Sequence, residues 1–173
     1  RVVFLDEDGV QHAMDLTAVL TTPIPRFETR TLEGGVAYIR FDDFDRARYD
    51  DFKAEIERLA AEPPPGLIID LRTNGGGLLN IDGAMTSWFF DDTQDYVVLK
   101  GRFIDRRMRV TASDGAYLGP LVILTGPGSA SGAELFAGTL QEKGRATVVG
   151  GTTRGAVTGT RAINLPDGGL LRV

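Results

Sequence analysis

The chain contains 173 residues, of which 42% are hydrophobic, and it carries a formal net charge of −5. This size supports one hydrophobic core and is too small for two independent domains of ordinary size. The acidic balance argues against nucleic-acid binding, which requires a concentrated surface of Lys and Arg. The absence of cysteine excludes disulfides, thiol catalysis and cysteine-based zinc sites, and a single histidine, His12, excludes a histidine-rich metal site.

The N-terminal residues are predicted to form a β-hairpin, with strands at 2–5 and 10–16 joined by the turn Asp6-Glu7-Asp8-Gly9. A connector containing Thr and Pro, at 21–25, is the best candidate for a domain boundary. The chain shows no initiator Met, no signal pattern and no apolar stretch of membrane-spanning length. Because it begins and ends inside apparent strands, we expect it to be part of a longer polypeptide whose export signal has been removed.

The middle of the chain alternates strands with helices. A strand is predicted at 35–41, and an amphipathic helix at 45–61 that stops at three consecutive prolines. The apolar face of this helix consists of Tyr49, Phe52, Ile56 and Leu59. A buried strand at 67–72 follows, and then a helix at 81–90. The aromatic residues of that second helix are expected in the core rather than in a ligand pocket; they are Trp88, Phe89 and Phe90.

The second half continues the alternation. A hairpin is predicted from strands at 96–104 and 107–112, then a buried strand at 121–124, a helix at 132–143 and a strand at 146–149. A loop rich in Gly and Thr occupies 150–159, and a final hairpin turns at Pro166-Asp167-Gly168. Strands that alternate with helices predict a layered α/β sheet.

Two loops are predicted to meet at one edge of this sheet. The strand at 67–72 runs into Thr73-Asn74-Gly75-Gly76-Gly77, whose glycines let backbone N–H groups approach a ligand closely. The strand at 121–124 delivers Gly128-Ser129-Ala130-Ser131-Gly132 to the start of a helix. A serine beside free N–H donors is the minimum equipment for acyl transfer, because a developing oxyanion needs fixed donors. Ser131 is therefore the candidate nucleophile.

Ser131 also has a purely structural interpretation. Ser131 and Glu134 have the spacing of a capping box, in which the serine oxygen accepts a first-turn N–H and the glutamate reaches back. Local spacing alone does not separate the two roles. A lipase-type nucleophile elbow does not fit, because Ala130 occupies the central position of the segment 128–132.

Five segments follow one another in a distinctive order: GVAYIRF at 35–41, GLIIDLRTNGGG at 66–77, GPLVIL at 119–124, GSAS at 128–131 and GRATVVG at 144–150. This order closely resembles the carboxyl-terminal processing (tail-specific) serine protease family. The resemblance implies a ClpP/crotonase-like α/β core with a mixed sheet and flanking helices over 26–173. It also implies that Ser131 matches the nucleophile and that the N–H groups of Gly132 and of Gly76 or Gly77 match the oxyanion hole. Residues 1–25 would then be the remnant of a PDZ-like segment with its connector.

The chain departs from this family where the catalytic base is expected. Members with a serine–lysine dyad carry Thr-x-Gly-Lys-Gly after the strand equivalent to 146–150, with a supporting glutamine four residues after the lysine. Here Ala156 stands at the lysine position and Thr160 at the glutamine position. Arg154 stays charged and cannot act as a base, but it could bind a substrate carboxylate. The loop at 150–159 is expected to stand away from Ser131, and the missing base to cost about 10²–10⁴ in rate.

Three explanations of Ala156 stay open at this point. Ala156 could be an engineered replacement of lysine. A histidine could serve instead, for which His12 is the only candidate, although its place in the N-terminal hairpin indicates an ordinary surface residue. The base could also come from sequence beyond Val173, or be absent.

The sequence therefore predicts a serine-type endopeptidase domain of low activity, exported to the periplasm or outside the cell, that needs no metal or organic cofactor. Its expected substrates are unfolded or C-terminally tagged proteins or peptides. One alternative is a catalytically silent member that binds peptides or lipids, which fits Ala156 and Thr160. The other is an acyl-CoA enzyme of the crotonase type, for which the sequence places no carboxylate or basic patch to serve a CoA thioester.

Overall fold

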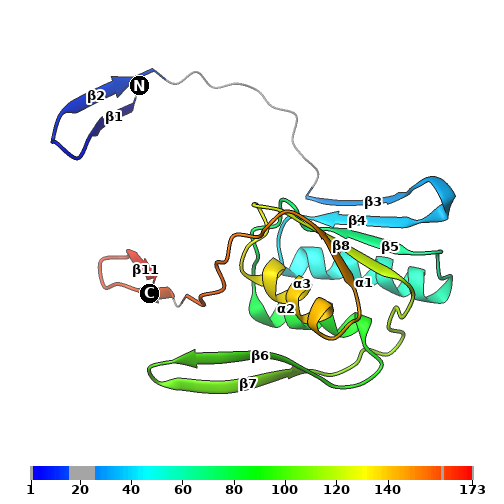
Figure 1. The fold of residues 1–173 in the computed structure, drawn as a ribbon. Coiled ribbons are helices and arrows are strands. Elements are labelled where there is room, and N and C mark those ends of the chain that lie inside the picture. The colour runs from blue at the N-terminus through cyan, green and yellow to red at the C-terminus, as the bar shows by residue number, and fades with distance from the viewer. Residues whose placement is uncertain (1, 16–25, 161, 173) are drawn as a thin grey trace.

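The computed structural model describes residues 2–15, 26–160 and 162–172, and a five-stranded mixed sheet forms its centre (Figure 1). The strands lie in the order β3 (Phe27–Thr31), β4 (Ala37–Phe41), β5 (Leu67–Asp70), β8 (Leu121–Thr125) and β9 (Thr147–Gly150). β3 runs antiparallel to β4, and the other neighbouring strands run parallel. The predicted α/β class with a mixed sheet is confirmed.

The helices gather on one face of this sheet (Figure 1). They are α1 (Arg46–Ala61), α2 (Leu79–Thr86) with the short 3-10 helix η2 (Ser87–Phe89), and α3 (Gly132–Glu142). A second 3-10 turn, η1 (Glu33–Gly35), connects β3 to β4. The predicted limits of α1 are confirmed: the Asp45 carboxylate caps the helix by accepting the N–H of Arg48 at 2.8 Å, and three prolines follow its end.

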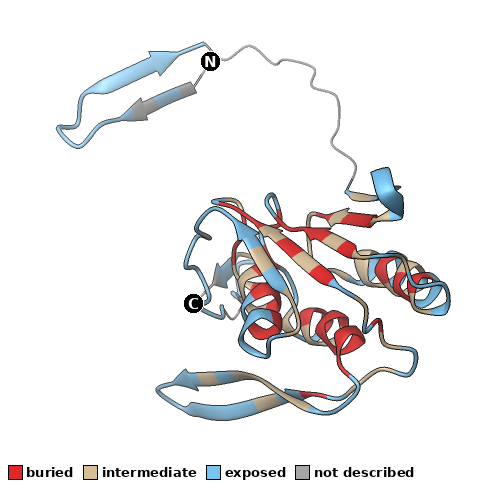
Figure 2. Cartoon of the chain, turned by 45° about the vertical axis from the view of Figure 1, so that its right-hand side comes forward, coloured by how far each residue is buried: buried red, intermediate tan, exposed pale blue. Residues whose placement is uncertain are grey.

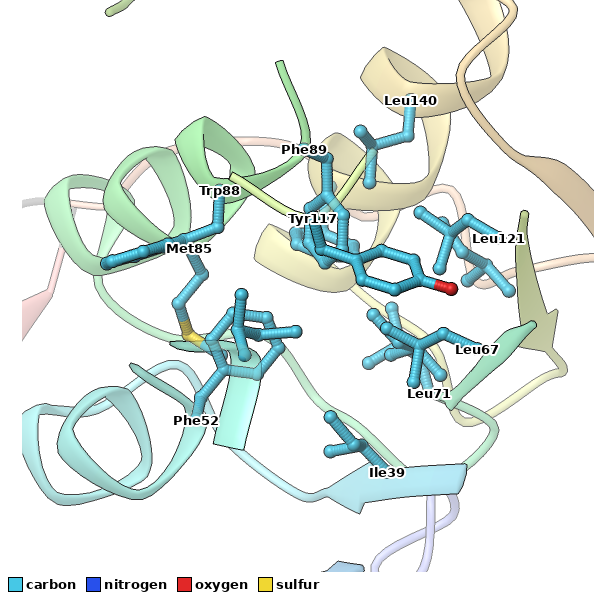
Figure 3. Close-up of a cluster of buried hydrophobic side chains, with 14 of the residues drawn as sticks. Ile39, Phe52, Leu67, Leu71, Met85, Trp88, Phe89, Tyr117, Leu121 and Leu140 are labelled. Carbon is cyan, nitrogen blue, oxygen red and sulfur yellow. The ribbon is translucent and has the colours of Figure 1, made fainter. Parts of the chain in front are cut away.

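The core fills the space between the sheet and the helices (Figures 2 and 3). Five phenylalanine rings from both layers pack with centroids 5.1–6.0 Å apart; they are Phe41, Phe44, Phe52, Phe89 and Phe136. Each ring is fully buried, which contributes about 1.5–3 kcal/mol per side chain. The expectation that Trp88, Phe89 and Phe90 belong to the core is confirmed.

The remaining strands form separate two-stranded sheets. β1 (Val2–Leu5) pairs with β2 (Gln11–Met14), and β10 (Ala162–Asn164) pairs with β11 (Leu170–Arg172), as the sequence predicts. β6 (Gln94–Gly101) and β7 (Ile104–Val110) form the predicted hairpin, but its turn lies at 102–103 and not at 105–106. The division at 25 stays a prediction, and the connector at 21–25 lies outside the described residues.

Two elements differ from the predicted ones. β3 was not predicted, because Phe27–Thr31 carries charged side chains and lies at the edge of the sheet with little buried surface. The helix predicted at 81–90 begins two residues earlier and tightens into η2 at Ser87. None of the helices in the described ranges is long and apolar enough to cross a membrane.

Candidate active site

The sheet register brings the two candidate loops together. β5 and β8 are parallel neighbours, with Asp70 opposite Leu124, so the loops that follow them leave the sheet at the same edge. Hydrogen bonds then connect the loops directly. The Ser129 hydroxyl donates to the Leu71 carbonyl at 2.7 Å, and the Ala130 N–H donates to the Asn74 carbonyl at 3.1 Å. The prediction that both strand ends point to one place is confirmed.

Gly76 lies in contact with the turn that carries Ser131. A Cβ atom on Gly76 would lie 2.7 Å from the Ser131 Cβ, 2.8 Å from the Ala130 carbonyl oxygen and 2.8 Å from the Gly132 nitrogen. The backbone there also has φ +101°, which side chains rarely adopt. Glycine at 76 therefore permits the close approach of the two loops.

Ser131 has an unusual backbone conformation, with φ 51° and ψ −116°. Within the described ranges, it is the one residue other than glycine that has a positive φ. Such a conformation costs about 1–3 kcal/mol and persists where the surrounding structure imposes it, commonly at active sites. Sequence patterns gave no sign of this strain.

The glycine loop leaves one N–H group free beside Ser131. The Gly76 N–H donates to Asn74 Oδ1 at 2.8 Å, and the Gly76 carbonyl accepts the Phe44 N–H at 2.9 Å. Neither the Gly77 N–H nor the Gly132 N–H has a hydrogen-bond partner in the part of the chain that the structure describes. A Cβ on Gly132 would lie 3.4 Å from the Gly77 nitrogen, so these two groups are neighbours. Of the two glycines that the sequence left open as donors, Gly77 is the available one.

The capping box predicted at the start of α3 forms through its glutamate half: the Ser131 N–H donates to Glu134, whereas the Glu134 N–H donates to the Ser131 carbonyl at 2.9 Å and not to its hydroxyl. Glu134 does more than cap, because its carboxylate also binds the loop that contains Ala156. Glu134 Oε2 accepts the N–H groups of Ser131 at 2.9 Å and of Ala156 at 2.8 Å, while Oε1 accepts the N–H of Gly155 at 2.6 Å. The expectation that this loop stands away from Ser131 is therefore wrong. The reason is a hydrogen-bonding partner distant in sequence, which the composition of the loop does not reveal.

The other candidates from the sequence lie around this centre or apart from it. The Arg154 N–H donates to the Ser129 carbonyl at 3.0 Å, and Arg154 is exposed. Thr160 is exposed. His12 is a surface residue, as predicted: its side chain is 47% exposed, and its Nε2 lies 2.6 Å from Asp6 Oδ2 within the β1–β2 hairpin.

Asp82 was missed by the sequence reasoning. It is fully buried on α2, and its Oδ2 lies 3.3 Å from the position that a Cβ on Gly132 would occupy. The hydroxyls of Tyr96 and Thr86 face this carboxyl, but no hydrogen bond of ordinary geometry from a described residue reaches either of its oxygens. Burial raises the pKa of Asp82 well above its usual range. An acid between apolar positions such as Ile81 and Met85 was the signal available in the sequence.

Comparison with known proteins assigns this arrangement to a family. The sequence profile of peptidase family S41 matches residues 35–173, which is most of the chain and contains both loops. The chain belongs to peptidase family S41. A carboxy-terminal-processing protease of Bartonella bacilliformis is 30% identical over 171 residues, covering 95% of this chain and 39% of that protein. A carboxyl-terminal-processing protease of Synechocystis is 35% identical over 140 residues, covering 80% of this chain and 32% of that protein.

Solved structures agree with the S41 fold. A photosystem II D1 C-terminal processing protease superimposes with a TM-score of 0.73, at 23% identity, over 88% of this chain and 43% of its own. At that identity the likeness shows the fold alone. This S41 chain spans less than half the length of these relatives. The family resemblance drawn from the five segments is confirmed.

Proposed function

We propose that this chain is a serine-type endopeptidase domain in which Ser131 is the nucleophile and the N–H groups of Gly77 and Gly132 form the oxyanion hole. The observation that carries the proposal is the strained backbone of Ser131 beside two N–H donors without partners. Strain of this kind concentrates where a side chain must be held in a reactive position. The family assignment supports peptidase chemistry over the crotonase-type alternative.

In this mechanism the Ser131 oxygen attacks the carbonyl carbon of the scissile peptide bond, and the carbonyl oxygen becomes the oxyanion. The two N–H groups donate to it, and the N-terminus of α3, which begins at Gly132, favours the same negative charge. The C–N bond then breaks as the amine leaves with a proton, and water hydrolyses the acyl-enzyme. Acylation requires a group that takes the hydroxyl proton and returns it to the amine, and deacylation requires the same group to take a proton from water and return one to Ser131.

The residues around Ser131 supply this base poorly. Although burial acts to raise it, hydrogen bonds from Thr153 and from three backbone N–H groups lower the pKa of Glu134, so its carboxylate is a weak proton acceptor. Asp82 is fully buried, and because burial raises its pKa its carboxyl keeps its proton and does not supply the base. Ala156 has no titratable side chain, although its backbone lies beside the nucleophile. We therefore expect the unmodified chain to turn over substrate slowly.

Unfolded or C-terminally tagged proteins are the proposed substrates. Several relatives are named carboxy-terminal-processing proteases, which fits a substrate that ends near the site. Arg154 is exposed next to the nucleophile turn, and its guanidinium suits recognition of a terminal carboxylate. We also propose that the protein is exported and that residues 1–25 derive from a PDZ-like segment.

Restoring the lysine tests this function. In Ala156→Lys, the new amine starts from a backbone held beside Ser131 and can accept its proton if its pKa is depressed. Hydrolysis of an unfolded casein should rise above the background of the unmodified chain by about 10²-fold or more. Thr160→Gln is expected to add to the gain by orienting the amine.

Two controls decide the assignment. Adding Ser131→Ala to the Ala156→Lys variant should return hydrolysis to background. Robust hydrolysis by the unmodified chain that Ser131→Ala abolishes would show that another base exists. Hydrolysis that survives Ser131→Ala would remove the catalytic role of this serine.

A further inference from the structure

Glu134 is the only side chain in the described site that binds both the nucleophile turn and the loop at the lysine position. One of its oxygens, Oε2, accepts the N–H groups of Ser131 and Ala156 together. The backbone nitrogens of these two residues are therefore no further apart than two hydrogen bonds laid end to end. The other oxygen fixes Gly155, the residue before Ala156.

We propose that Glu134 is a positioning residue that latches the segment 153–156 onto the turn of Ser131, and so determines where the side chain at 156 emerges. This inference rests on the proposed function for its catalytic consequence, but the latch itself is a property of the fold. It assigns Glu134 a role beyond the capping of α3.

The chemistry of the latch requires an ionised carboxylate. Three N–H groups point at two oxygens, and only the carboxylate form offers acceptors alone in every direction. Burial acts to raise the pKa of the Glu134 carboxyl, and the main groups that lower it are the Thr153 hydroxyl and these three N–H groups. The latch is therefore closed at neutral pH.

A second connection shows what the latch adds. The Arg154 N–H donates to the Ser129 carbonyl, so the segment would stay near the turn even without Glu134. Residues 155 and 156 lie beyond that connection and depend on the carboxylate for their direction. Loss of Glu134 should therefore reorient position 156 while the segment remains attached at 154.

Hydrogen exchange of the backbone amides tests the latch without any need for activity. Glu134→Ala and the isosteric Glu134→Gln should each speed exchange at Gly155 and Ala156 by about tenfold or more, because hydrogen bonds to a charged acceptor are lost. Glu142→Ala, on the same helix with a side chain 79% exposed, is the matched control and should leave these rates unchanged. Protection of the β8 amides reports whether each variant is folded. Unchanged exchange at Gly155 and Ala156 in a folded Glu134→Gln would overturn the proposal.

A second readout joins the latch to the chemistry. If Ala156→Lys speeds the labelling of Ser131 by a fluorophosphonate, adding Glu134→Gln should remove most of that gain, and adding Glu142→Ala should keep it. A gain that persists with Glu134→Gln would contradict the positioning role. If Ala156→Lys gives no gain, the proposal that a base at 156 serves Ser131 fails, and the exchange rates still decide the latch.

Discussion

Ser131 combines two demands that a single residue rarely meets. It precedes the first residue of α3, where its N–H donates to Glu134, and it holds φ 51°, a conformation that glycine adopts more easily. The backbone conformation at the start of α3 directs the Ser131 N–H toward Glu134 and places the Ser131 Cβ against Gly76. The structural and the catalytic interpretations of this serine are thus compatible.

The strain at Ser131 gives a prediction about stability. Ser131→Gly removes the strain, whereas Ser131→Ala keeps it, and both variants retain the backbone N–H that donates to Glu134. The free energy of unfolding in urea should therefore be higher for Ser131→Gly than for Ser131→Ala, by about 1–3 kcal/mol. Equal stability of the two variants would mean that the backbone of Ser131 is not strained in solution.

Asp82 gives a prediction about pH. Because burial raises its pKa in the folded state, the folded chain keeps a proton that the unfolded chain releases above the ordinary value of 3.8. Its contribution to stability is full at acidic pH and declines as the pH rises toward the folded pKa. Asp82→Asn has no proton to lose, so its free energy of unfolding relative to that of the unmodified chain should rise as the pH rises above 3.8. Urea unfolding from pH 4 to pH 8 measures it, and a difference that does not change with pH would contradict the buried, protonated acid.

Among the secondary-structure elements, the glycine loop between β5 and α2 requires glycine at one position but not at its neighbour. Gly75→Ala should be tolerated, because its Cβ meets nothing within 4 Å. Gly76→Ala places a Cβ against the backbone of Ala130 and Gly132, which cannot move cheaply, and should cost about 1–3 kcal/mol. Thermal unfolding of both variants, with fluorophosphonate labelling of Ser131, checks the pair. Comparable loss of stability in the two variants would show that the contact between the loops does not limit the site.

At the scale of the whole molecule, the sequence predicts the elements whose apolar periodicity is strong. α1, β5, β8 and α3 follow from their buried faces, and the order of segments leads to family S41. The latch at Glu134 could not be predicted, since its partners at 155 and 156 lie about twenty positions away and are backbone groups. Strain at Ser131 and the free N–H of Gly77 depend likewise on how two loops meet in space.

The position of the oxyanion tests the proposed active site most directly. A crystal structure of the Ala156→Lys variant after reaction with a peptidyl phosphonate should show a bond between phosphorus and Ser131 Oγ. We predict that one phosphoryl oxygen lies about 2.7–3.1 Å from the backbone nitrogens of both Gly77 and Gly132. An adduct on a different residue, or a phosphoryl oxygen turned away from these two N–H groups, would contradict the proposed active site.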